Sequence, residues 1–138
     1  MGTAIVMRGV SAGGTESAIA QIDVPMNGNL IGVEWSGRSD LDADGEFQFW
    51  QLSFGSAANE TNDARQVIAM SSAGFLTVLT AVGTGIGVCD KYTRLPDISV
   101  GMGERLFLHS IASAGVVGLV YAILHFDFDL DKVAVRRR

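Results

Sequence analysis

Apolar residues alternate with a period of two along the last third of the chain, and this pattern limits the folds available. Successive side chains of a β-strand point to opposite sides, so the pattern predicts a strand with one buried face from residue 116 onward. The opposite face begins apolar and turns polar at His125. The apolar face comprises Val116, Val120, Ala122, Leu124, Phe126, Phe128 and Leu130.

Similar β-prone segments, separated by glycine and polar residues, recur through the rest of the chain. Turns are expected at residues 11–14, at Asn27-Gly28 and at residues 101–103. Residues 66–72 fit a helical turn or a strand equally well. The other expected strands cover residues 4–10, 16–24, 29–36, 46–54, 75–82, 88–95 and 104–113.

About eight short strands without intervening helices predict an all-β fold, a single-domain antiparallel β-sandwich of the jelly-roll type. An immunoglobulin-like sandwich is the competing fold, but the single cysteine, Cys89, leaves no pair for its disulfide. The length of 138 residues suits one domain. We assign it to residues 1–133, followed by a basic tail at residues 134–138.

Two long uncharged stretches, residues 67–89 and 106–126, raise the alternative of membrane-spanning helices. Both stretches contain several glycine, serine or threonine residues, which favours buried strands bounded by turns. The N-terminal residues lack the apolar core of a signal peptide. The sequence therefore predicts no membrane association.

Charge is distributed unevenly along the chain. The net charge is −5, and removal of the terminal Arg136, Arg137 and Arg138 leaves 7 basic against 15 acidic residues, or −8. An acidic body disfavours direct nucleic-acid binding. We interpret the three arginines as a partner-binding element; the alternative is a solvated terminus.

An acidic segment matches the first half of a calcium-binding EF-hand loop. Asp40, Asp42 and Asp44 alternate before Gly45, as carboxylate ligands of a hard cation do. The twelfth position is Gln51 instead of the bidentate glutamate. Calcium at these aspartates is therefore one interpretation and a solvated acidic turn is the other; no other cofactor is expected.

No recognisable catalytic motif occurs, and we predict that the protein is not an enzyme. His109 and His125 are symmetric about residue 117, where a tight hairpin would place them opposite each other. Such a pair could act as a pH switch or bind a metal. The alternative is two half-buried histidines satisfied by neighbouring groups.

Residues 101–109 (GMGERLFLH), the small residues 112–115 and the strand at residues 120–127 together resemble the last hairpin of a known group of proteins. These are the small jelly-roll virion proteins of tailed bacteriophages, known as capsid cement or decoration proteins. Residues 32–37 and 50–55 fit the same pattern. The resemblance implies a non-enzymatic virion protein, commonly a homotrimer, that binds the major capsid protein or another virion protein.

Residues 46–54 and 116–123 carry apolar side chains on both faces, so we expect a second subunit to cover one of them. Trp50 is the candidate contact residue. The alternative function is a small lectin-like module, in which Trp35, Trp50 and the acidic loop bind a sugar with the help of calcium.

Deletion of residues 135–138 tests the role of the basic tail. We expect folding and self-association to persist and attachment to the larger assembly to weaken, because the arginines orient the protein against acidic surfaces. Raised salt should partly mimic the deletion. Full occupancy of particles by the truncated protein at low and high ionic strength would contradict this prediction.

Overall fold

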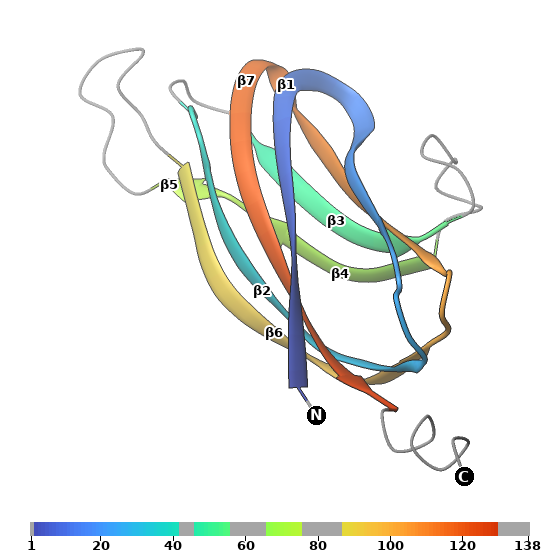
Figure 1. The fold of residues 1–138 in the computed structure, drawn as a ribbon. Coiled ribbons are helices and arrows are strands. Elements are labelled where there is room, and N and C mark those ends of the chain that lie inside the picture. The colour runs from blue at the N-terminus through green and yellow to red at the C-terminus, as the bar shows by residue number, and fades with distance from the viewer. Residues whose placement is uncertain (1, 42–45, 56–65, 76–86, 130–138) are drawn as a thin grey trace, which may run out of the picture.

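A computed structural model of the chain describes residues 2–41, 46–55, 66–75 and 87–129, which form strands and connecting turns without a helix (Figure 1). The predicted all-β, jelly-roll-like sandwich is confirmed. The strands are β1 (Gly2–Asp23), β2 (Gly28–Ser39), β3 (Gln48–Phe54), β4 (Gln66–Ser72), β5 (Gly74–Phe75), β6 (Gly87–Val100) and β7 (Arg105–Phe128).

The two longest strands, β1 and β7, take part in both layers of the sandwich. They pair antiparallel from Gly2 opposite Asp127 to Asp23 opposite Arg105. The other edge of β7 pairs with β3 over residues 106–112 and with β2 over residues 118–128. The described strands thus form one hydrogen-bonded sheet, in the order β4-β3-β7-β2-β6-β5 with β1 on β7, which folds into two layers. The layer that we call the first sheet contains the first half of β1, the second half of β7, β2, β6 and β5, and the second sheet contains the remaining halves, β3 and β4.

The expected turn at residues 11–14 and the hairpin that the resemblance implied at residues 112–115 are instead bends inside these long strands. No hairpin forms at residues 11–14 or at residues 112–115; β1 and β7 stay paired with each other and arch together from one sheet into the other (Figure 1). Register shifts accompany the curve on both sides of Gly14, which pairs with Ala112. Gly115 has a φ of 83°, a conformation that glycine adopts without a steric penalty. Small residues and glycines thus bend two paired strands without ending either.

The expected strand end before Pro96 is also wrong, because β6 continues to Val100. Three residues of β6, Leu95 to Asp97, lie between the partners of Leu30 and Gly32 in β2. Asp97 has a φ of 43°, so the ladder resumes after a bulge that accommodates the proline.

Residues 66–72, which fitted a helical turn or a strand equally well, form a strand, β4, at an edge of the second sheet. Its Ser71 hydroxyl lies 2.7 Å from the Cys89 sulfur of β6, a buried contact between the two sheets. Only Phe75 of the expected strand at residues 75–82 is described, within β5. No helix in the described ranges is long and apolar enough to cross a membrane.

The core lies between the sheets and confirms the face predicted for β7. Trp35 of β2 and Trp50 of β3 are its largest buried side chains. Leu130 lies outside the described residues. The other six residues of the predicted apolar face, Val116, Val120, Ala122, Leu124, Phe126 and Phe128, are all buried.

A buried polar cluster joins β1, β3 and β7 next to the bend. Gln48 of β3 is fully buried; its Nε2 donates to the Ser110 hydroxyl at 2.6 Å, and its Oε1 accepts from the Ser11 hydroxyl at 3.1 Å. The cluster fits closely under Gly118, because a Cβ there would lie 2.6 Å from Gln48 Oε1.

Replacement of Gln48 by leucine tests this cluster. The change leaves the hydroxyls of Ser11 and Ser110 without their amide partner in a buried site, so we expect the free energy of unfolding to fall by about 1–3 kcal/mol. Urea denaturation followed by circular dichroism measures the change. Gln21→Leu, at an exposed position of β1, is the control and should alter stability by less than about 0.5 kcal/mol.

Candidate functional site

The side of the first sheet that points away from the core is the candidate site, and we call it the outer face. Side chains alternate along each strand, so Met7 and Gly9 of β1 are buried while Val6, Arg8 and Val10 are exposed. The pairing registers place the corresponding residues of the neighbouring strands beside them. The outer face comprises Val6, Arg8 and Val10 of β1; Val117, Leu119, Tyr121, Ile123 and His125 of β7; Glu34, Ser36 and Arg38 of β2; and Val88, Asp90 and Tyr92 of β6.

Five of the eleven large apolar side chains that are exposed in the described residues lie on this face; five others, Phe47, Phe49, Val67, Met70 and Ile111, lie on or beside β3, β4 and the first half of β7 in the second sheet. Val6 is 55% exposed, Val10 51% and Tyr92 53%, and Val117 and Tyr121 are also exposed. The half-buried Leu119 and Ile123 of β7 fill the space between β1 and β2. Single apolar residues on a surface are common, whereas a continuous patch is typical of an interaction surface.

Tyr92 is held in place although half of it is exposed. Its ring covers Gly32 of β2, where any Cβ would overlap the phenol. The ring also meets the His125 ring of β7 edge to face, with centroids 5.7 Å apart and an interplanar angle of 70°. The apolar surface is therefore a fixed shape built across three strands.

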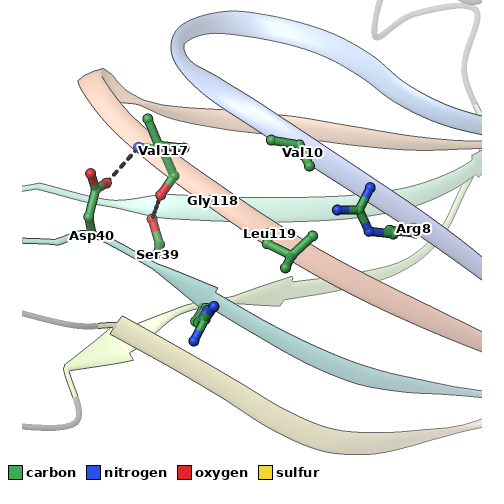
Figure 2. Close-up of a pocket in the computed structure, with 8 residues that line it drawn as sticks. Arg8, Val10, Ser39, Asp40, Val117, Gly118 and Leu119 are labelled. Carbon is green, nitrogen blue, oxygen red and sulfur yellow. Dashed lines mark hydrogen bonds between the residues drawn. The ribbon is translucent and has the colours of Figure 1, made fainter.

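Opposite charges lie among these apolar side chains. Arg8, Arg38 and Asp90 are exposed and form no ion pair within the described ranges. Asp40, just beyond β2, accepts a hydrogen bond from the Val117 backbone N–H at 2.6 Å (Figure 2). Its carboxylate thereby fixes the end of β2 to β7.

Two hollows mark the outer face. One, of about 450 Å³, is lined by Arg8, Val10, residues 38–40 and residues 117–119 (Figure 2). The other, of about 560 Å³, lies between β2, β6 and β7, with Arg38, Asp90 and Tyr121 among its lining residues. Each hollow is lined by apolar side chains and at least one charged side chain, a combination that also occurs where two proteins contact each other.

The prediction that Trp50 contacts a partner is wrong. Its side chain is 0% exposed and packs over Gly37, where a Cβ would lie 2.8 Å from the indole ring. The exposed aromatic residues near this position are Phe47 and Phe49, whose ring centroids are 5.4 Å apart. Because both faces of residues 46–54 are apolar, alternation alone does not reveal which face is buried.

The lectin-like alternative loses its sugar-stacking platform for the same reason. Trp35 is 0% exposed, like Trp50, so neither indole ring is available to a ligand. The two tryptophans form part of the hydrophobic core.

The other predicted site residues are only partly described. Asp40 lies at the end of β2, while Asp42, Asp44, Arg136, Arg137 and Arg138 lie outside the described residues. Among residues 2–41, 46–55, 66–75 and 87–129, no group of three His, Cys, Asp or Glu side chains is close enough to hold a metal ion.

The interpretation that His109 and His125 face each other across a hairpin is wrong, because both belong to one continuous strand. His109 pairs with Ala18 and Gln51, and His125 pairs with Ala4 and Gly32. The two imidazoles therefore lie in different sheets.

Sequence reasoning did not single out the residues at the two borders of the outer face, Val6, Arg8, Asp90 and Tyr92. Residues 4–10 are apolar and β-prone, which predicts a strand and leaves open which of its faces is exposed. The juxtaposition of β1, β7, β2 and β6 depends on pairings between distant segments, which leave no local signal in the sequence.

No family model matches the chain, and no curated protein matches it. Among solved structures, the chain is similar to the Eiger TNF from S. frugiperda, with a TM-score of 0.53, 12% identity and coverage of 92% of this chain and 94% of that one. It is also similar to a structure of the infectious bursal disease virus Gx strain, with a TM-score of 0.50 and 7% identity, covering 92% of this chain and 32% of the viral one. At such low identity these likenesses show the fold, a jelly-roll-like sandwich found in a TNF protein and in a viral structure.

Proposed function

We propose that this protein is a non-enzymatic structural protein of a virus particle, a capsid cement or decoration protein on the head of a tailed bacteriophage. In this proposal three copies associate through the outer face and bind the major capsid protein or another virion protein. The protein needs no cofactor for this role. The observation that carries the proposal is the group of exposed apolar side chains that β1, β7 and β6 present on the outer face, Val6, Val10, Val117, Tyr121 and Tyr92.

Burial of this patch supplies the driving force for self-association. Removal of apolar surface from water contributes roughly 25 cal/mol per Å². The backbone pairing of β1, β7, β2 and β6 already fixes the strands beneath these side chains, so little backbone conformational entropy is lost on binding. A preformed apolar face thus favours a stable assembly.

Two further observations support a virion role. A jelly-roll-like fold is shared with the viral chain described above. Residues 101–109, which resemble the corresponding segment of phage cement proteins, form the turn before β7 and its first residues. That turn is fixed by hydrogen bonds of the Gly103 N–H to the Val24 carbonyl at 2.8 Å and of the Met102 N–H to Asn27 Oδ1 at 2.8 Å.

Addition of the purified protein to phage heads that lack it tests the proposed role. We expect the protein to cosediment with heads at a saturable occupancy and to raise the temperature at which heads release their DNA. Sedimentation measures the occupancy, and a melting assay with a DNA-binding dye measures the temperature at which DNA is released. Heads from the source phage that bind none of the protein would overturn the virion assignment.

Val6→Glu tests self-association through the outer face. A carboxylate buried within an apolar contact must lose its water, so we expect the dissociation constant to rise at least about tenfold. Light scattering coupled to size exclusion measures the oligomer across a concentration series. Met102→Glu, at a more exposed apolar position in the turn between β6 and β7, is the control and should leave the oligomer unchanged. A wild-type monomer at micromolar concentration would contradict the proposal.

A further inference from the structure

The two borders of the outer face carry the same side-chain pattern with opposite charge. On β1 the outward sequence is Val6, Arg8 and Val10, so a cation lies between two apolar residues. On β6 the outward residues aligned with them are Tyr92, Asp90 and Val88, so an anion lies between two apolar residues.

The pairing registers place Arg8 and Asp90 in one row across the sheet. Arg8 pairs with Tyr121, Tyr121 with Ser36 and Ser36 with Asp90. Three strand spacings of about 4.8 Å separate the two backbones by roughly 14 Å, which is too far for an ion pair within one copy. Two neighbouring rows of outward residues cross the sheet in the same way, one from Val6 to Tyr92 and the other from Val10 to Val88.

We propose that Arg8 of each copy forms an ion pair with Asp90 of a second copy, so that the β1 border of one outer face packs against the β6 border of the next. This inference rests on the proposed self-association and names the contact that orients it. The partner that binds this face is therefore a second copy of this chain, because the β1 border carries a cation between two apolar residues and the β6 border carries an anion between two apolar residues.

The chemistry of the two borders suits such a contact. Arginine presents a planar group that can bind a carboxylate through two parallel hydrogen bonds. The apolar residues that flank Arg8 and Asp90 would meet each other on either side of the pair and exclude water from it. Two further charges of β2 lie one row from Asp90 on either side: Arg38 has the same sign as Arg8, and Glu34 has the sign of Asp90. The contact between copies therefore depends on the Arg8–Asp90 pair itself, and raised salt should weaken it.

Charge reversal of each residue tests the inference. We expect Arg8→Glu and Asp90→Arg each to raise the dissociation constant of the oligomer about tenfold or more, because like charges then face each other. The double variant Arg8→Glu/Asp90→Arg restores opposite charges and should return the constant to near its wild-type value. Arg105→Glu is the matched control, because Arg105 pairs with Asp23 of the same copy at 3.3 Å, away from this face.

Mixing the two single variants shows whether the residues pair between copies. Glu at position 8 of one variant can face Arg at position 90 of the other, while the native Arg8 and Asp90 of the mixed pair also face each other. Association should therefore recover in the mixture. In a dimer of the two variants, both contacts have opposite charges. In a ring of three copies, two of the three contacts do. No recovery on mixing, or no rescue in the double variant, would overturn the inference.

The outcomes separate this inference from the proposed function. Single reversals without effect, together with dissociation by Val6→Glu, would overturn the Arg8–Asp90 pair and leave self-association through the outer face intact. A wild-type monomer would overturn both. Circular dichroism of every variant, unchanged from wild type, excludes unfolding as the cause of a lost oligomer.

Discussion

Antiparallel pairing between β1 and β7 holds the two layers of this protein together, because each of these strands belongs to both sheets. The pairing runs from Gly2 opposite Asp127 to Asp23 opposite Arg105. The other edge of β7 then carries β2 in one layer and β3 in the other. The relative position of the layers is consequently set by backbone hydrogen bonds as well as by side-chain packing.

A paired double strand can pass between layers only if it bends without losing its ladder. Register shifts around Gly14 and the positive φ of Gly115 provide the bend. The bend leaves polar groups inside, and Gln48 satisfies two of them through the hydroxyls of Ser11 and Ser110. A buried amide is favourable here because both of its ends have partners.

The same pairing explains why an apolar surface remains exposed. The inward side chains of β7 fill the space between the layers, and the outward ones, Val117 to Ile123, have no third layer over them in the described structure. Phe47 and Phe49, beside and within β3 of the second sheet, are likewise apolar side chains that remain exposed. A two-layer sandwich buries one side of each sheet, so apolar residues on the second side are available to other chains.

Local pattern determined much of the fold. The period-two alternation from residue 116 identified a strand and its buried face correctly, because side-chain direction in a strand depends only on parity. The all-β class followed from similar β-prone segments and from the absence of helical periodicity. Residues 66–72 remained ambiguous because a short apolar run suits a helix or a strand until neighbours decide.

Only the tertiary structure decided which glycine-rich segments close hairpins and which apolar faces stay exposed. Residues 11–14 and 112–115 have the composition of turns, yet neither closes a hairpin, because Ala12 pairs with Val117 and Gly14 with Ala112, contacts between segments about one hundred residues apart. Trp50 and Phe49 are neighbours with similar propensities, and the side occupied by the opposite sheet buries the first and exposes the second. The row from Arg8 to Asp90 likewise exists only after four strands have paired, because no local sequence rule brings residues 8, 121, 36 and 90 together.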